Sequence, residues 1–494
     1  MYSLHLVKPG FSPVPEMPKK LRRLAVYLPP MQPVCLSLLL ALASTSLPAT
    51  ETRNVVVILT DDQGYQDLGC FGSPRIRTPN LDRMAKEGRR FTNLMVPSPV
   101  CTPSRAGLLT GCYPKRVGLH RGVLFPTSRH GLHPDEFTLA ELFGSRGYAT
   151  ACIGKWHLGH FPEVLPRAQG FDSYFGIPYS NDMNHPDNVN KTTLRRDASW
   201  NDLPEAARRW RTPLVRDEAI AEFRVDQRTI TRRYTDEAIR FVTENRDRPF
   251  FLYLPHSMPH VPLFVPEDAY DPDPRNAYKC VIEHLDAEVG RLVDTLRREG
   301  LAGKTLVIFT SDNGPWLPFG NHGGSAKPLR GGKGTTFEGG MRVPCVMWAP
   351  GLVPAGSECG DLMSTIDLLP TLAALHDWEL PERPIDGIDA SGRITGKAGS
   401  AREEFLYYTS QGEPDAIRVG PWKLLAATTK RPAPLLYNLE EDVGERHDRA
   451  AERPELVARL RDRLAERDQE LGSEARPTWK ATAPHPWPDN PPTH

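Results

Sequence analysis

Residues 54–64 read NVVVILTDDQG. The first seven are apolar or β-branched apart from Asn54, a composition typical of a strand buried on both faces of a sheet. Similar apolar runs of strand length follow at 250–255, 305–314 and 345–350. Stretches with helical apolar spacing lie among them, at 81–91, 138–147, 276–300 and 364–375. This alternation predicts an α/β sandwich around a central, mostly parallel sheet.

The chain has 494 residues, which is too long for one ordinary core and indicates a large domain with a smaller one. We assign the large α/β domain to residues 51–395. Short strands and one late helix (455–471) then predict a small C-terminal α+β subdomain over 396–472. Residues 473–494 are rich in proline and are predicted to be a disordered tail. Residues 160–230 are polar, aromatic and rich in proline, and we expect a long surface excursion.

Charge and cysteine content exclude several classes of protein. Lysine plus arginine and aspartate plus glutamate each number 61, so the formal net charge is zero and we expect no nucleic-acid partner. The eight cysteines are scattered without a C-x-x-C pair, which argues against a zinc site and against a dense disulfide framework. One or two disulfides are compatible with the pattern, which does not assign them.

The N-terminal 50 residues have the features of a secretory signal peptide. Residues 19–23 are strongly basic, residues 34–43 are apolar, and small residues follow up to Ala49. The apolar run is too short to span a bilayer, so residues 1–50 are predicted to be a signal peptide and extension, with Met17 as an alternative start. We therefore expect an exported protein, periplasmic or secreted, without stable membrane insertion. A short N-terminal anchor is the alternative.

Two predicted strands are followed by similar polar pairs. Asp61 and Asp62 come directly after 54–60, and Asp312 and Asn313 follow the strand that begins at 305. Oxygen side chains at the carboxyl ends of strands lie where open α/β sheets form their sites, and adjacent aspartates repel each other unless a cation neutralises them. Each pair could instead cap the following loop. Two matched pairs favour an all-oxygen Ca²⁺ or Mg²⁺ site.

Basic side chains recur near further strand ends. Lys155 and His157 are two residues apart, so in an extended segment they share a face. His256 and His260 follow the strand at 250–255, where one of them could be only a loop hydrogen-bonder.

A glycine-rich loop at 330–344 carries Lys333 but lacks Walker spacing. The simpler interpretation is a flexible phosphate-type loop. The functional interpretation is that the loop brings the Lys333 side chain to a bound oxyanion. A hard cation with lysines, histidines and an arginine suits a charged tetrahedral ester, whether phosphate, phosphonate or sulfate. Composition does not choose among these three.

The stretch 101–111, CTPSRAGLLTG, closely resembles the sulfatase signature C/S-x-P-S-R-x-x-x-x-T-G. The chain from 54 to about 450 resembles the arylsulfatase A type of the alkaline phosphatase superfamily. Further motifs fall in the order of that family, namely NVVVILTDDQGYQDLGCFG, GKWHLG, GIPYSND, TSDNG, GKGTTFEGGMRVP and LYNLEED. The resemblance implies an alkaline-phosphatase-like sandwich.

The resemblance implies that Cys101 is not used as a thiol. In this family the cysteine is oxidised after synthesis to formylglycine, whose aldehyde hydrates to a gem-diol. One hydroxyl attacks sulfur and the alcohol leaves, and the second hydroxyl then drives elimination of sulfate and regenerates the aldehyde. A maturation partner is also implied, either an aerobic-type formylglycine-generating enzyme or an anaerobic maturase.

One Ca²⁺ per subunit is implied in the same way. Its ligands carry over to Asp61, Asp62, Asp312 and Asn313, with residue 101 also touching the ion. Arg105 matches the arginine that holds the diol and supports the metal site.

The residues that handle sulfate carry over individually. Lys155 and Lys333 match the sulfate-binding lysines, and Lys333 is also placed to stabilise the leaving oxygen. His157 matches the base that deprotonates the diol, and His260 matches the histidine that donates to the leaving group. His256 falls four residues early and is left out.

Substrate contacts are expected from several segments. Ser180 matches a family serine near the sulfate, and Asp182 is a weaker candidate. Asn321 and His322, in the loop 316–328, are further candidates for substrate-specific contacts, as is the excursion.

Together these inferences predict an exported Ca²⁺-dependent sulfatase that acts on a sulfated carbohydrate or an aryl sulfate. The alternative is a phosphonate or phosphate ester hydrolase with the same signature and maturation. A non-catalytic sulfoglycan-binding protein would have lost a metal ligand, Cys101 or a lysine, and none is lost. The sequence does not specify which sugar and position, endo or exo action, or oligomeric state.

Overall fold

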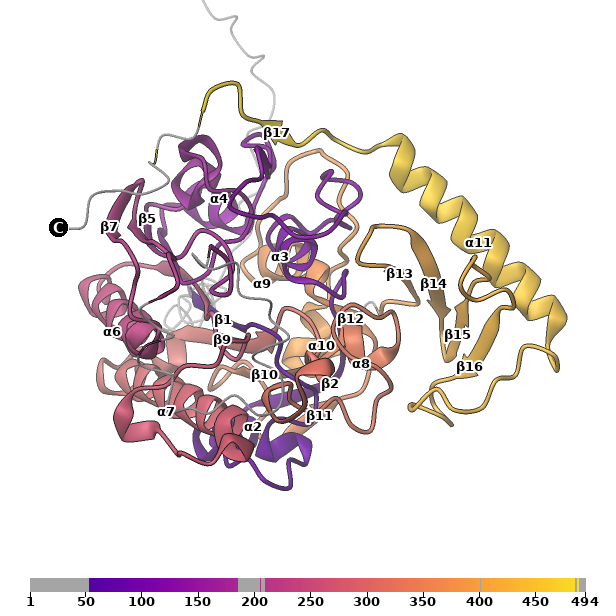
Figure 1. The fold of residues 1–494 in the computed structure, drawn as a ribbon, viewed down its shortest axis with the longest axis horizontal. Helices are drawn as coiled ribbons and strands as arrows, with labels where there is room; N and C mark the ends of the chain where they lie inside the picture. The colour runs from indigo at the N-terminus through magenta and orange to yellow at the C-terminus, as the bar shows by residue number, and fades with distance from the viewer. Residues whose placement is uncertain (1–52, 185–204, 206–208, 400, 485–486, 488–494) are drawn as a thin grey trace, which may run out of the picture. The chain divides into compact units, whose positions relative to one another are not determined.

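The computed structural model describes residues 53–184, 205, 209–399, 401–484 and 487. Its main element is an 11-stranded sheet in the order β11-β2-β10-β9-β1-β8-β4-β5-β6-β7, with β12 beside β2 (Figure 1). The strands are β1 (Asn54–Thr60), β2 (Arg89–Met95), β4 (Ala149–Ile153), β5 (Ser173–Gly176), β6 (Leu214–Arg216), β7 (Ala219–Glu222), β8 (Phe250–Pro255), β9 (Thr305–Ser311), β10 (Arg342–Trp348), β11 (Ser357–Cys359) and β12 (Met363–Ser364).

The centre of this sheet is parallel. β1 pairs in parallel with both β8 and β9, and β4 continues the parallel set beside β8 and β5. β10 is antiparallel to its neighbours β9 and β2. Because Thr60 is in register with Ser311, the residues after β1 and β9 emerge side by side at one edge of the sheet.

The side chains of β1 alternate between two apolar layers. Val55, Val57 and Leu59 face one layer, and Val56 and Ile58 face the other, all without solvent exposure. The first layer is covered by α3 (Cys101–Thr110), α4 (Leu139–Gly144) and α9 (Leu368–Leu375). The second is covered by α2 (Pro79–Glu87), α6 (Gln227–Glu244) and α7 (Ala277–Arg298) (Figure 1). The predicted α/β sandwich with a mostly parallel centre is confirmed.

One local prediction was wrong, and one helix was not predicted. The helix expected over 81–91 ends at Glu87, and the chain from Arg89 forms β2 instead. Gly88 separates them, and a Cβ there would lie 2.2 Å from the carbonyl oxygen of Met347, so only glycine fits this close approach. Helix α6 was not predicted; only its first turn falls within the expected surface excursion, and the rest lies beyond residue 230.

The excursion itself is only partly on the surface. Within it, β5 extends the parallel sheet beside β4, and β6 and β7 add antiparallel strands. Most side chains from 174 to 183 are buried, because this stretch forms and follows β5. Residues 185–204 and 206–208 lie outside the described residues.

The C-terminal region forms the predicted small α+β unit. Four antiparallel strands, β13 (Glu404–Tyr408), β14 (Pro414–Val419), β15 (Trp422–Leu425) and β16 (Leu435–Asn438), lie beside α11 (Pro454–Ser473). Their apolar residues belong to the same buried cluster as Val55, and residues 53–484 fall within one compact unit.

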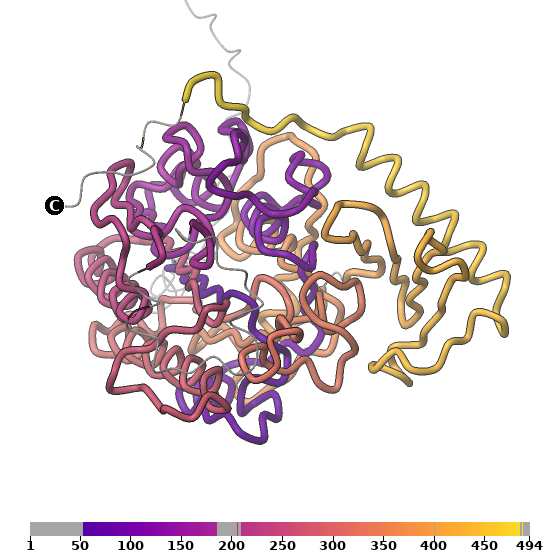
Figure 2. Tube along the Cα trace, in the orientation of Figure 1, coloured from indigo at the N-terminus to yellow at the C-terminus, as the bar shows by residue number. Residues whose placement is uncertain are grey.

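The prediction of a disordered tail from Ser473 was wrong for residues 474–484. After α11 the chain runs back across the molecule (Figure 2). There β17 (Trp479–Lys480) pairs with β3 (His130–Gly131), because the extended backbone finds hydrogen-bonding partners on β3. The predicted signal peptide and the last residues, 488–494, lie outside the described residues.

Short helices complete the fold. They are α8 (Glu338–Met341), α10 (Ser391–Thr395) and the 3₁₀ segments Gly69–Phe71, Pro162–Val164, Pro166–Gln169, Glu267–Ala269, Pro274–Asn276, Ala302–Lys304, Leu317–His322 and Thr365–Asp367. The seven cysteines within the described residues are all free. In the same part of the chain we find no helix with the length and apolar character needed to cross a membrane.

Candidate active site

The ends of β1 and β9 bring the two polar pairs into contact. The backbone N–H of Asp62 donates to Asp312 Oδ1 (3.2 Å), and Asn313 Nδ2 donates to Asp62 Oδ1 (2.7 Å). All four side chains of the pairs are buried. Asp62 has a left-handed backbone (φ 66°), a costly conformation that turns the chain sharply at this edge. The proximity expected from the sequence is therefore present.

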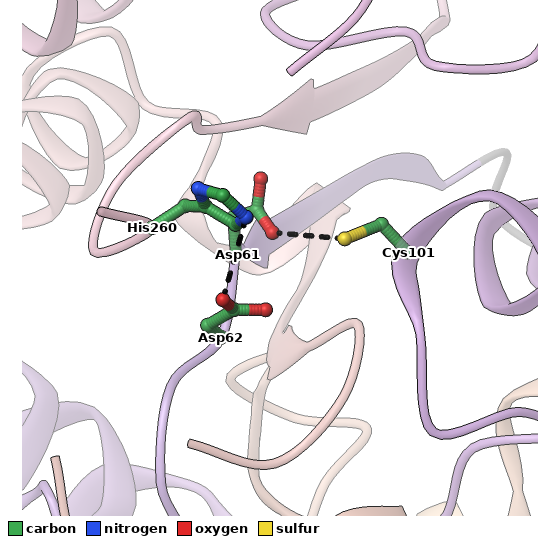
Figure 3. Close-up of side chains that lie close together, drawn as sticks. All are labelled: Asp61, Asp62, Cys101 and His260. Atoms are coloured by element: carbon green, nitrogen blue, oxygen red, sulfur yellow. Dashed lines mark hydrogen bonds and ion pairs between the residues drawn. The ribbon is translucent and has the colours of Figure 1, made fainter. Parts of the chain in front are cut away.

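Helix α3 begins at Cys101 and places Arg105 one turn later, on the same face. Arg105 Nε donates to Asp312 Oδ2 (2.9 Å), Nη1 donates to the carbonyl oxygen of Lys155 (2.6 Å), and Nη2 lies 2.8 Å from the same Asp312 oxygen as an ion pair. Cys101 Sγ lies 3.5 Å from Asp61 Oδ1 and 3.5 Å from Lys333 Nζ. Figure 3 shows the sulfur directed towards Asp61, with Asp62 and His260 alongside.

Lys155 approaches the cluster from the chain that follows β4. Its ammonium group forms an ion pair with Asp61 and donates to Ser180 Oγ (3.1 Å). The turn before it depends on Gly154, whose backbone is at φ 137° and whose Cβ would lie 1.9 Å from the carbonyl oxygen of Pro255. Only glycine satisfies both conditions.

His157 does not follow the extended geometry assumed from the sequence, because its φ is 62°. Its Nε2 lies 2.8 Å from the carbonyl oxygen of Leu124, which can only accept a hydrogen bond. The proton is therefore assigned to Nε2, and Nδ1 presents a lone pair that is buried with no hydrogen-bond partner among the described residues. Burial and the charge of Lys155 hold the pKa of His157 well below its usual range, so the ring is neutral.

Lys333 and His260 reach the cluster from the opposite side. Lys333 Nζ lies 2.8 Å from the Asp62 carboxylate, and His260 Nε2 lies 3.5 Å from Asp62 Oδ2. Trp316 packs against both, with its ring centroid 4.3 Å from Lys333 Nζ and 5.3 Å from the His260 ring. Sequence reasoning missed Trp316, although it comes only three residues after Asn313.

Burial and mutual repulsion shape the charges of the site. Burial, together with the charges of Asp61 and Asp312, raises the pKa of Asp62 to about 7 despite Lys333. Burial alone would raise the pKa of Asp61, but the positive charges led by Lys155 hold it well below its usual range. Burial and Asp61 raise the pKa of the Cys101 thiol, so it stays protonated and is a poor nucleophile.

The oxygen donors of the cluster fit a hard cation, whereas the sulfur of Cys101 and the ring nitrogen of His260 are not ligands that such a cation prefers. Ligand atoms of four side chains lie within 4.8 Å of one another, namely those of Asp61, Asp62, Cys101 and His260. Among the described residues, Asn313 Oδ1 is buried without a hydrogen-bond partner, which is costly unless something binds it. Buried carboxylates and an orphaned amide oxygen are the ligands that Ca²⁺ and Mg²⁺ prefer. Asp312 lies outside the tight group of four and bonds Arg105 instead.

The predicted substrate-contact residues differ in their burial and in their position relative to the cluster. Asp182 is buried, and its charge acts on His260, whose pKa burial and Lys333 nevertheless lower to about 3. Asn321 is exposed and lines a cavity formed with other residues, including Asp67, so nothing places it at the cluster. His322 is buried beside it.

Comparison with known proteins agrees with this site. The sulfatase family model matches residues 53–377. The chain belongs to the sulfatase family. It is 39% identical to human arylsulfatase A over 446 residues, which covers 83% of this chain and 86% of that protein. It is 34% identical to pig N-acetylgalactosamine-6-sulfatase over 450 residues, covering 83% and 84% of the two chains.

Solved structures agree as well. The crystal structure of Ps i-CgsB in complex with k-i-k-neocarrahexaose superposes with a TM-score of 0.73 at 30% identity, covering 86% of this chain and 94% of that one. The phosphonate monoester hydrolase of Agrobacterium radiobacter shares the fold at a TM-score of 0.59 and 20% identity, covering 85% and 96%. This sulfatase is therefore of the arylsulfatase A type and hydrolyses sulfate esters.

Proposed function

We propose that this sulfatase acts through a formylglycine made from Cys101 and one Ca²⁺. The observation that supports this most strongly is the convergence on position 101 of an acidic group and two ammonium groups, Asp61, Lys155 and Lys333. When present, the hydrated aldehyde would supply an oxygen nucleophile that the buried thiol does not. The modification requires a maturation enzyme as a partner.

Asp61, Asp62, Asp312 and Asn313, with residue 101, would hold the Ca²⁺. The ion would supply positive charge that polarises oxygen atoms at position 101 and on the sulfate. The orphaned Asn313 Oδ1 and the raised pKa of Asp62 support this assignment, since both indicate an unmet need for a cation. Arg105 holds the site together by tying α3 to Asp312.

Lys155 and Lys333 would bind the sulfate oxygens, which is supported by the approach of both ammonium groups to the carboxylates beside Cys101. The hydroxyl of Ser180 orients Lys155, and the ring of Trp316 supports Lys333 from behind. Lys333 also neutralises charge on the leaving oxygen, a contribution of the kind that costs about 10²–10³ in kcat when one donor is removed.

The two histidines have opposite proton arrangements. His157 is neutral with a free lone pair on Nδ1, so it would accept the proton of the second hydroxyl at position 101, the one that drives elimination of sulfate. His260 Nδ1 lies 2.6 Å from the carbonyl oxygen of Val261 and donates to it, so a second proton must sit on Nε2 for donation to the leaving group. Burial and Lys333 outweigh the negative charges of Asp182 and Asp61 and lower the pKa of His260 to about 3, so the negative charge of a bound sulfate ester would be needed to favour that second proton.

The substrate we propose is a sulfated carbohydrate or an aryl sulfate, with Ser180 and Asp182 near the sulfate. We also propose export through the N-terminal signal peptide. The test compares kcat/KM for p-nitrophenyl sulfate with that for p-nitrophenyl phosphonates, using purified protein from a maturation-competent host. Preference for the sulfate is expected, and far faster phosphonate cleavage would show that the reaction has been assigned wrongly.

A further inference from the structure

A cavity of about 490 Å³ opens beside the start of α3, outside the catalytic cluster. The loop before β3, the strand β3 itself and the strand β17 from the C-terminal segment form its walls. Figure 1 shows β17 and α3 in the same upper part of the molecule. The residues that matter here are Thr102, Arg121, Leu124, Arg129, His130 and Lys480.

One wall of the cavity is shared with the proposed base. The hydroxyl of Thr102 donates to the carbonyl oxygen of His157 (2.9 Å) and accepts from the backbone N–H of Leu124 (3.2 Å). The carbonyl oxygen of Leu124 in turn holds His157 Nε2. Thr102, which lines the cavity, follows Cys101 in the chain and is hydrogen-bonded to the backbone of His157, so the cavity adjoins both residues.

The cavity is basic. Arg121, Arg129, His130 and Lys480 line it, and none of the described residues that line it is acidic. Within the described part of the chain, no ion pair involves Arg121, Arg129 or Lys480, although Arg129 donates to the carbonyl oxygen of Ala483 (2.7 Å). Burial, and to a smaller extent the charge of Lys480, lowers the pKa of His130, so its ring is neutral. The positive charge of the cavity therefore comes from Arg121, Arg129 and Lys480.

Arg121, Arg129 and Lys480 are exposed, so solvent screens part of their mutual repulsion, and an anion bound among them would neutralise the rest. We propose that this cavity binds a second anionic group of the substrate, a sulfate or carboxylate on a sugar residue adjacent to the sulfated residue that is cleaved. The inference rests on the proposed function and extends it to a multiply charged carbohydrate. Phe125, half exposed on the same loop, offers an apolar face for a sugar ring beside the cavity.

The test uses inhibition of p-nitrophenyl sulfate hydrolysis by a sulfated dextran oligosaccharide, with unsulfated dextran of equal length as a reference and an oligogalacturonate to separate sulfate from carboxylate. The double variant Arg121→Ala/Lys480→Ala removes two of the charges. We expect its inhibition constant for the sulfated dextran to rise about tenfold, because each ion pair between an exposed side chain and the ligand contributes modestly. This rise should exceed any change in KM for p-nitrophenyl sulfate. High salt should reduce the difference.

The matched control is Arg459→Ala, which removes an exposed arginine on α11 that does not line the cavity. An equal inhibition constant in the wild type, the double variant and this control overturns the proposal, as does a wild type that neither charged oligosaccharide inhibits. If the wild type does not hydrolyse p-nitrophenyl sulfate, the proposed function has failed instead. Direct titration of labelled sulfated dextran into the same three proteins then measures binding without turnover and tests the cavity independently of the reaction.

Discussion

Lys423 joins the C-terminal subdomain to the loop that carries Lys333. Its side chain is fully buried, and its ammonium group donates to the carbonyl oxygen of Thr336 (2.8 Å) and to Glu338 Oε1 (3.0 Å). It also pairs with Glu445 Oε1 (2.8 Å), while the backbone N–H of Glu338 donates to the same Glu445 carboxylate (2.7 Å). The subdomain therefore fastens the loop only a few residues beyond Lys333.

Lys423→Met removes this cation while keeping a similar volume. Two carboxylates would remain buried beside each other, and breaking a buried ion pair by removing one partner costs about 3–5 kcal/mol. The loop would also lose its anchor. Because misplacement by about 1 Å can cost around 10²-fold in rate, kcat/KM for an aryl sulfate should fall about 10- to 100-fold.

Urea unfolding gives the stability, and steady-state kinetics under conditions where the variant is folded give the rate. Lys430→Met serves as the control, since Lys430 is exposed in the same subdomain. A loss below about 1 kcal/mol, equal to that of the control, would refute the reasoning, because an exposed pair contributes no more than this.

Three further predictions follow from other parts of the structure. Removal of divalent metal by a chelator should lower both turnover and the unfolding temperature, and adding Ca²⁺ should restore them. The reason is that three buried carboxylates, Asp61 among them, repel one another when no cation is bound. Unchanged turnover after verified metal removal would count against the metal site. Gly154→Ala should leave little folded protein, whereas Gly147→Ala, at φ 80° with nothing within 4 Å, should cost only about 1–2 kcal/mol. Equal yields and unfolding midpoints would contradict the close approach. Burial would raise the pKa of Glu338, but Lys423 and other cations hold it at about 2. Its carboxylate therefore stabilises the fold above its ordinary pKa of 4.5, and this contribution is lost as the pH falls towards 2, so Glu338→Gln should flatten acid unfolding in that window.

Much of the fold follows from local patterns in the sequence. The run at 54–60 is buried on both faces, so its composition alone indicates a central strand, and β1 has these bounds. The approach of Asp62 to Asp312 could be expected because parallel strands end at the same edge. The extent of α7 also follows from its apolar spacing and the glycine after it.

Other features depend on contacts between distant segments, which no local pattern encodes. β2 forms because Gly88 passes close to Met347 and the following residues pair with β10. β17 forms only through its pairing with β3. Trp316 joins the site through its packing on Lys333, and the sequence around a loop tryptophan does not show which distant residue it contacts.

The central claim concerns the chemical state of position 101. A mass spectrum of the peptide that contains it, from active protein made in a maturation-competent host, tests this claim most directly. We predict a species about 18 Da lighter than the cysteine peptide, the difference expected when the thiol is replaced by an aldehyde, in a proportion that rises with specific activity. Fully active protein with only unmodified Cys101 would contradict the account.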